Sequence, residues 1–305
     1  TMSTKQAFLR KTTTQSLWFC LFLFFSCESS VEETQDPPSG SALSLPKVIL
    51  AFESSALPAK LSAEKEDLES RLSEKLNRLA KTTVSADTTD VAGSFRLGKI
   101  DLAFLSPRNA VPLLDQKVAS VFLVRLPGDK PEKSIWLCKK EKNYADISEA
   151  KGKAIAFANR ASDPGCLIPI RDLSRRNLIG SDRALTDFFS QVIYGDGSAS
   201  VVRKVLNGEV EALAMGSSAF ETLDEKTKAR LRIFQEQESV PPDVLCIRSS
   251  ISAPDRAIIE QAFMDMNADN PDLVRSVFGG KLAKPTQGHL DLTRETLEAI
   301  KTVKP

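Results

Sequence analysis

The chain has 305 residues, of which 42% are hydrophobic and 27% charged, ordinary values for a folded protein and enough length for two domains. Lys and Arg number 41 against 40 Asp and Glu, so a net charge of +1 gives no field that would favour nucleic acid. The single histidine, His289, argues against a histidine-based catalytic triad and a multi-histidine metal site. Composition therefore argues against a hydrolase and a metalloenzyme. From the whole sequence we expect no enzyme activity, no cofactor and no metal.

The N-terminus has the pattern of a secretory signal. Lys5, Arg10 and Lys11 precede an apolar run at residues 17–25, which is too short to span a membrane. Residues 1–26 are therefore predicted to be a signal peptide, and the protein is expected to be exported to the periplasm or cell envelope.

The Ser26-Cys27 pair resembles the processing site of bacterial lipoproteins, in which the cysteine becomes lipidated. Acyl chains on Cys27 would anchor the protein to a membrane. Residues 27–46 are polar and rich in Ser, Pro and Gly, which is typical of a flexible tether. Plain cleavage near this point, giving a soluble exported protein, remains the alternative.

A first α/β lobe is predicted to begin at Lys47. Polar residues follow its apolar strands, and these are the first candidate ligand residues: Glu53 and Ser54 after the first strand, then Ser106, Arg108 and Asn109 after the third. The expected elements are strand 47–52, helix 61–79, strand 82–86, helix 88–97, strand 100–105, a helix opened by Pro107, and strand 117–125.

A second lobe repeats this pattern. Strand 154–158 leads to a loop with Ser162, Asp163 and Gly165 and then a helix, and strand 191–194 leads to a turn with Asp196 and Ser198 and a helix that stops at Gly208. Strand 210–215 follows. Ligands bind at the carboxyl ends of strands in such parallel sheets, so these loops are candidate ligand residues.

Two strands of similar character, residues 134–139 and 243–248, are expected to cross between the lobes. We predict an α/β fold of the type II periplasmic binding protein class, with two open α/β domains joined by two crossover strands and closing by a hinge. Lobe 1 would comprise residues 47–133 and 249–305, the latter mostly helical, and lobe 2 residues 134–248, including both hinge strands.

The order of motifs from Lys47 to Arg248 resembles the phosphate, phosphite and phosphonate binding proteins of ABC transporters. The segments that carry the resemblance are KVILAF, GKIDLAFLSP, SIWLCKKEKNYADISEAKGKAIAFANRASDPG and FFSQVIYGDGSASVVRKVLNGEVEAL. The resemblance implies two α/β lobes with a small-molecule ligand between them and an ABC permease as membrane partner.

The ligand residues of that family carry over unevenly. Ser162 and Gly165 match its hydroxyl-rich loop, but Asp163 would repel a phosphonate and Pro164 lacks an N–H donor. The family's histidine aligns with Ser198, and the aspartate of its GxVDA segment aligns with Glu211. The resemblance therefore implies a retained scaffold with an altered pocket.

Two ligand classes remain open at this point. Arg108 and helix N-termini could hold an oxyanion, whereas Asp163, Asp196 and Glu211 could select an amine-bearing ligand. Each candidate also has a structural interpretation. Arg108 could be an exposed residue at a helix start, Ser162 and Ser198 could be N-caps, and the two aspartates could be turn residues.

Cys138 and Cys246 occupy similar places in the two expected crossing strands, and could form a disulfide in an oxidising compartment. Buried free thiols are the alternative.

The leading hypothesis is a monomeric, lipid-anchored solute-binding component of an ABC importer, without contact to nucleic acid. The alternative is a ligand-sensing or scaffold lipoprotein with the same fold and no role in transport.

Overall fold

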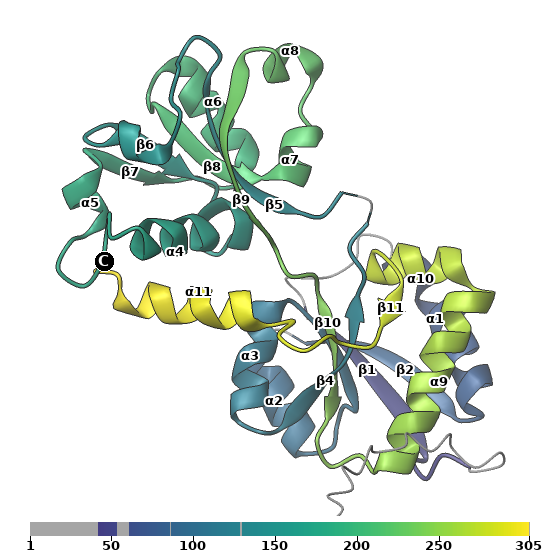
Figure 1. Cartoon of the computed structure of the whole chain (residues 1–305). Helices are drawn as coiled ribbons and strands as arrows, with labels where there is room; N and C mark the ends of the chain where they lie inside the picture. The colour runs from purple at the N-terminus through teal and green to yellow at the C-terminus, as the bar shows by residue number, and fades with distance from the viewer. Residues whose placement is uncertain (1–41, 54–60, 86, 129, 305) are drawn as a thin grey trace, which may run out of the picture. The chain divides into compact units, whose positions relative to one another are not determined.

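A computed structural model describes residues 42–53, 61–85, 87–128 and 130–304. The predicted signal peptide, Cys27, the tether as far as residue 41, and Ser54 lie outside the described residues. Two β-sheets, each with its own helices, organise the described part of the chain (Figure 1). None of the helices described there is long and apolar enough to cross a membrane.

The first sheet has six strands in the order β11-β4-β10-β3-β1-β2. Strand β1 pairs in parallel with β2 and β3, and β10 is antiparallel to both β3 and β4. The strands are β1 (Lys47–Glu53), β2 (Leu79–Ser85), β3 (Leu102–Leu105), β4 (Ala119–Arg125), β10 (Val244–Arg248) and β11 (Leu282–Ala283).

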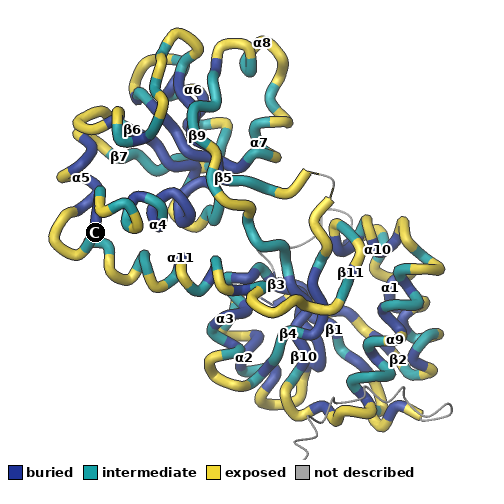
Figure 2. The backbone as a smooth tube through the Cα atoms, in the orientation of Figure 1, coloured by how far each residue is buried: buried dark blue, intermediate teal, exposed yellow. Residues whose placement is uncertain are grey.

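Helices cover both faces of this sheet and bury apolar residues against it (Figures 1 and 2). In α1, Leu61, Leu68, Leu72 and Leu76 are buried at spacings of seven and four residues, which place them on one helix face. One face carries α1 (Leu61–Leu76), α9 (Ala253–Asp269) and α10 (Pro271–Phe278), and the other carries α2 (Thr88–Arg96) and α3 (Pro107–Asp115).

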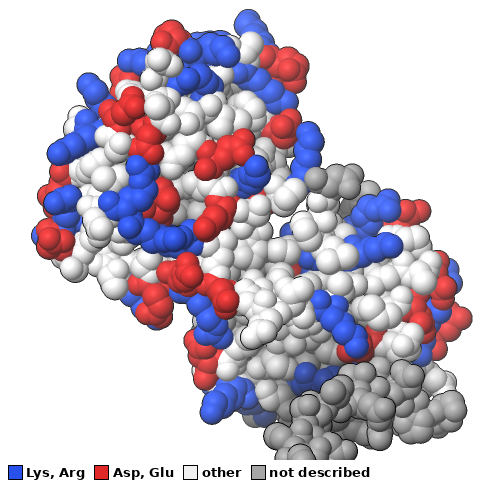
Figure 3. Space-filling view, in the orientation of Figure 1, with Lys and Arg blue, Asp and Glu red and all other residues white. Residues whose placement is uncertain are grey.

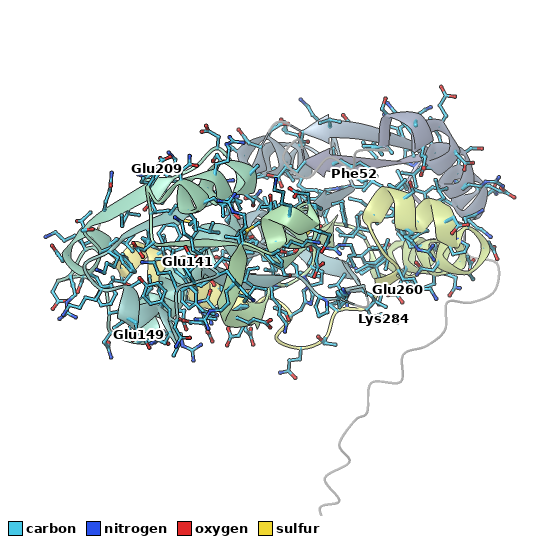
Figure 4. The ribbon with its side chains drawn as sticks, turned by 90° about the horizontal axis from the view of Figure 1, so that it is seen from above. Phe52, Glu141, Glu149, Glu209, Glu260 and Lys284 are labelled. Atoms are coloured by element: carbon cyan, nitrogen blue, oxygen red, sulfur yellow. The ribbon has the colours of Figure 1, made fainter. Side chains whose placement is uncertain are left out.

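Aromatic side chains fill the core on the α9 and α10 side. Phe104 meets Phe278 edge-on with ring centroids 5.2 Å apart, and Phe52 lies 5.8 Å from Phe278. Figure 4 labels Phe52 within the first sheet, and also Glu260 and Lys284, whose ion pair of 2.6 Å joins α9 to the chain after β11. Burial of these rings fixes the strand on which Glu53 is the last residue.

The second sheet has five strands in the order β7-β6-β8-β5-β9. Strand β6 is parallel to β7 and β8, whereas β5 is antiparallel to β8 and β9. The strands are β5 (Lys133–Lys139), β6 (Ala154–Phe157), β7 (Gln191–Tyr194), β8 (Ala212–Gly216) and β9 (Leu231–Ser239).

The helical segments of the second lobe begin with two short turns and continue with true helices. They are the 3₁₀ turn η2 (Ile147–Ala150), the π-helical turn η3 (Asp163–Leu167), α4 (Ile168–Arg175), α5 (Leu185–Phe188), α6 (Ser198–Asn207), α7 (Ser217–Glu221) and α8 (Glu225–Lys228). Gly208 ends α6 in the left-handed conformation, as the sequence predicts.

One crossing strand differs from the prediction. Residues 244–248 form β10, which belongs to the first sheet and not to the second lobe. The strand that pairs with β5 is β9, which sequence reasoning missed because its second half is polar and largely exposed. Hydrophobicity shows that β5 and β10 are both buried, but it does not show which sheet each one joins.

The suggested disulfide does not form. Cys138 in β5 and Cys246 in β10 are both free and buried, and they belong to different sheets. Burial raises the pKa of the Cys246 thiol to about 12, so this sulfur stays protonated and unreactive.

The C-terminal helix α11 (Asp291–Thr302) contacts both lobes, although the sequence assigned it to the first. Leu297 packs against the core of α2 and α3, and Ile300 packs against the core that contains α4. Arg294 donates to Asp115 of α3 at 2.7 Å, and the Lys304 amide donates to the Gly180 carbonyl at 3.0 Å. Helix α11 therefore joins α3 to the second lobe.

Candidate functional site

Four strands of the first sheet place polar residues in a row at one edge. Glu53 ends β1 and Ser106 follows β3, which runs parallel to β1. Asp243 precedes β10 and Arg125 ends β4, and β10 runs antiparallel to both of its neighbours. Adjacent strands lie about 4.8 Å apart, so these four residues occupy neighbouring positions along the carboxyl edge of the first sheet.

Glu53 is a buried carboxylate that is only half satisfied. Its side chain is among the buried polar groups, with 3% of the residue exposed. Oε1 accepts a hydrogen bond from the Asn109 side-chain amide, but the buried Oε2 has no hydrogen-bond partner. Such an oxygen costs free energy unless a donor or a proton reaches it.

The next two candidates also carry unsatisfied atoms. Ser106 precedes α3, but its hydroxyl makes no capping hydrogen bond, and Oγ is buried without a partner. Arg108 Nε is likewise buried without a partner. Glu53, Ser106 and Arg108 therefore bring three unused polar atoms to one edge.

In the second lobe, Ser162 is an N-cap. Its Oγ accepts from the Gly165 amide at 2.9 Å at the start of η3. A Cβ on Gly165 would lie 2.6 Å from the Cβ of Ala158, so the tight packing of this turn requires glycine. The turn directs Asp163 to the same small cavity as Arg108 of the first lobe.

The neighbouring turn folds onto the end of β6. The amides of Gly195 and Gly197 donate to the carbonyls of Phe157 and Ala158, both at 2.9 Å. This brings the N-terminus of α6, where Ser198 lies, beside the loop that carries Ser162. Asp196 is exposed, and its amide donates to Ser200 Oγ at 3.1 Å, as expected for a turn residue.

Glu211 does not belong to this site, contrary to the sequence interpretation. Its amide donates to the carbonyl of Ala154 at the beginning of β6, whereas the ligand loops follow the end of that strand. Four residues of strand span about 13 Å. Its carboxylate pairs with Lys142 at 2.8 Å and accepts from Tyr144 at 3.1 Å, and the Lys142 hydrogen bond holds its pKa low.

Sequence reasoning missed Asp243 and Arg125. The two side chains form an ion pair across the ends of their strands, with Arg125 Nη2 3.4 Å from an Asp243 oxygen. The Pro241–Pro242 pair marked a chain reversal in the sequence, but the position of Asp243 beside Ser106 follows from the antiparallel direction of β10. That direction depends on long-range pairing.

A small cavity lies between Arg108, Asp163 and α11. Its volume is about 10 Å³, room for roughly one water molecule. Its other lining residues are mainly apolar and come from α3, η3, α4, α11 and the segment before β10: Pro107, Leu167, Ile168, Val240, Pro241, Leu292, Thr293, Thr296 and Leu297. Arg108 and Asp163 therefore meet at a space whose lining is mostly apolar.

Acidic groups influence one another at this edge. Burial raises the pKa of Asp163, an effect that Arg108 opposes and Asp243 increases. Burial also raises the pKa of Asp243, which Arg125 opposes and Glu53 increases. Elsewhere, on the face shown in Figure 3, residues of both signs are interspersed. Among the described residues, no three His, Cys, Asp or Glu groups are placed to share a metal ion.

Two α/β lobes, two crossings of the chain and polar groups at strand ends define the class of two-lobed periplasmic binding proteins. Residues 50–286 match the family model described as "ABC transporter, phosphonate, periplasmic substrate-binding protein". Because the match covers most of the chain, the protein belongs to this family of substrate-binding proteins, which are not enzymes.

Solved structures of the same fold agree. XAC2383 from Xanthomonas citri, bound to ATP, has a TM-score of 0.66 at 17% identity, covering 85% of this chain and all of that one (100%). PhnD1 from Prochlorococcus marinus, in complex with methylphosphonate, has a TM-score of 0.59 at 15% identity, with 85% and 99% covered. A binding protein component of a phosphonate ABC transporter from Pseudomonas aeruginosa has a TM-score of 0.58 at 16% sequence identity, and the match covers 84% of this chain and 87% of that one.

Proposed function

We propose that this protein captures a small polar ligand between the carboxyl edges of its two sheets and presents it to an ABC permease. One observation carries the proposal. Three buried polar atoms without partners, Glu53 Oε2, Ser106 Oγ and Arg108 Nε, come from the ends of two neighbouring strands. Buried polar groups are normally satisfied, so a cluster of unsatisfied ones in a binding-protein fold favours a ligand that completes them.

The structural relatives supply a starting panel of ligands. PhnD1 is a complex with methylphosphonate, and a further relative is an aliphatic sulphonate binding protein from Escherichia coli, with a TM-score of 0.50 at 15% identity and 84% of each chain covered. We propose that Arg108, Ser106 and the N-termini of α4 and α6 contact the polar head of the ligand, with Asp163 closing the site from the second lobe.

Thermal unfolding and titration calorimetry of the purified protein test this proposal. The panel contains phosphate, phosphite, alkylphosphonates, sulfonates and their amino derivatives. A ligand at 100 times its dissociation constant adds about 2.7 kcal/mol to the free energy of unfolding. Arg108→Ala should weaken binding at least tenfold, whereas Arg275→Ala, at an exposed position on α10, should not. A panel without any binder would contradict the proposal.

We also propose that the protein is exported as a monomer and anchored through acyl chains on Cys27. The supporting observations are the short apolar run at residues 17–25, the small residue Ser26 before the cysteine, and the polar tether that follows. The family itself is periplasmic.

Metabolic labelling with radioactive palmitate in a bacterial host tests the anchor. The wild-type protein should carry label and sediment with membranes, and Cys27→Ser should lose the label and remain soluble. Cys20→Ser, which changes a cysteine inside the apolar run, is the matched control and should retain the label. Unlabelled wild-type protein would show that the exported form is not acylated.

A further inference from the structure

We infer that the ligand of this protein carries a protonated amine or guanidinium group, which Glu53 receives, and that an anion without such a group is a poor ligand. The inference rests on the proposed function, because it concerns the same site. It starts from Glu53 Oε2, an oxygen of a carboxylate that is only 3% exposed and has no hydrogen-bond partner.

The neighbours of Glu53 do not neutralise it. Asn109 donates to Oε1, but a carboxamide is uncharged. Arg125 is paired with Asp243 at 3.4 Å, and Arg108 acts electrostatically on Asp163. Within the described part of the chain, Glu53 forms no ion pair. Taking an unpaired carboxylate out of water is costly, so a cation delivered by the ligand would relieve an energetic cost that is already built into the site.

The charge balance of the edge points the same way. The candidate site carries three acids, Glu53, Asp163 and Asp243, and two bases: Arg125, which pairs with Asp243, and Arg108, which acts on Asp163. With all groups ionised, the acids outnumber the bases by one. The three carboxylates act on one another, since Asp243 raises the pKa of Asp163 and Glu53 raises that of Asp243. A doubly charged anion adds to this repulsion, whereas a group with one positive charge removes it.

An organic cation fits the geometry better than a metal ion. The carboxylates come from three separate segments, and among the described residues no three acidic, cysteine or histidine groups converge closely enough to hold a metal. Ser106 Oγ and Arg108 Nε are also without hydrogen-bond partners, and both residues follow β3, the strand that pairs with β1. The ligand is thus expected to offer a cation to Glu53 and a hydrogen-bond acceptor to Arg108.

Matched pairs of probes that differ in one amino group test the inference by titration calorimetry on the purified full chain. The pairs are 2-aminoethylphosphonate with ethylphosphonate, and β-alanine with propionate. We expect the amine-bearing member of a pair to bind at least 30-fold more tightly.

Glu53→Gln is the decisive variant, because it keeps the shape and the oxygen that accepts from Asn109 but removes the charge. Its discrimination between the members of a pair should fall below threefold. Glu211→Gln changes a carboxylate at the opposite edge of the second sheet and should leave the discrimination intact.

The outcomes separate the two proposals. If wild-type protein binds the amine-free probe as tightly as its partner, the inference is wrong while the proposed function stands. If no probe and no member of the wider panel binds, both are wrong. Full discrimination retained in Glu53→Gln would also overturn the inference. The wild-type comparison needs no variant, so a folding defect in Glu53→Gln would not leave the question open.

Discussion

Carboxylates at the two edges of the sheets have opposite environments. The amino edges are those at which the parallel strands begin. There Asp101 pairs with Arg248 at 2.7 Å, Asp255 accepts a hydrogen bond from the Ser44 amide at 2.8 Å, and Glu211 pairs with Lys142. At the carboxyl edges, Glu53 has an unsatisfied oxygen.

The directions of the pKa shifts follow this division. Burial raises the pKa of Asp255, but the hydrogen bonds from Ser44 outweigh it and leave the pKa low. For Asp163 and Asp243 burial dominates, and their pKa values are raised. The three acids at the amino edges are thus fully paired, whereas burial of Asp163 and Asp243 outweighs the arginines beside them, and one oxygen of Glu53 has no partner. Perturbed acids of this kind mark candidate functional sites.

The largest expected effect on stability comes from removing one partner of the buried ion pair at the amino edge of the first sheet. Arg248→Met leaves the Asp101 side chain, which is 7% exposed, without its cation. Loss of one partner of a buried ion pair costs about 3–5 kcal/mol of folding free energy. Chemical denaturation measures this, and adding Asp101→Asn should recover part of the loss. Arg125→Met, whose partner Asp243 is 31% exposed, is the control and should cost less. Equal losses would remove the distinction between the edges.

A second change disrupts the carboxyl edge of the second sheet. A Cβ on Gly195 would lie 2.4 Å from Ser200 Oγ and 3.1 Å from the Ala158 carbonyl. Gly195→Ala should therefore destabilise the protein by about 1–3 kcal/mol and weaken ligand binding. The matched control is Gly93→Ala in α2, where a Cβ meets nothing within 4 Å and the helix should gain about 0.5–1 kcal/mol. Thermal unfolding of both variants gives the comparison.

The pH dependence of stability should differ in sign between the edges. Because the pKa of Asp163 is raised on folding, its stabilising contribution is lost as pH rises from about 4, the unfolded value, through the folded pKa. Asp163→Asn should therefore be more stable than wild type at pH 7 and similar to it below pH 4.

Glu211 provides the opposite case. Its pKa is lowered on folding by the Lys142 hydrogen bond, so its contribution is present above the unfolded pKa and is lost as pH falls through the folded pKa. Glu211→Gln should be less stable than wild type at pH 7 and converge with it in acid. The urea midpoints of both variants and of wild type, measured from pH 3 to 8, test these predictions. If both variants were more stable than wild type at pH 7, or both less stable, the proposed difference between the two edges would be contradicted.

The smallest effect is expected at the surface. The Arg275–Asp272 pair joins side chains that are 72% and 93% exposed. Exposed ion pairs of this kind contribute less than about 1 kcal/mol, so Arg275→Ala should change the unfolding midpoint very little. A large loss of stability in Arg275→Ala would mean that the exposure of an ion pair does not predict its contribution to the free energy of unfolding.

Local patterns predicted much of the site. Each strand of the first lobe that the sequence placed before residue 126 is present, and Glu53, Ser106, Arg108 and Asn109 gather at one edge because parallel strands end on the same side. The N-cap interpretation is confirmed for Ser162 and wrong for Ser198, because Gly197 is the N-cap of α6 and no side chain caps that helix. These features depend on short-range patterns in the sequence: the spacing of hydrophobic residues, the residue types at turns and the residues that cap helices.

The sequence by itself determined the alternation of strands and helices and hence the loops that could bind a ligand. The tertiary structure decided which strands pair. It placed β10 in the first sheet, brought Asp243 and Arg125 to the site, and left Glu211 at the opposite edge. An apolar run shows that a strand is buried, but its neighbours and direction depend on contacts between residues more than a hundred positions apart.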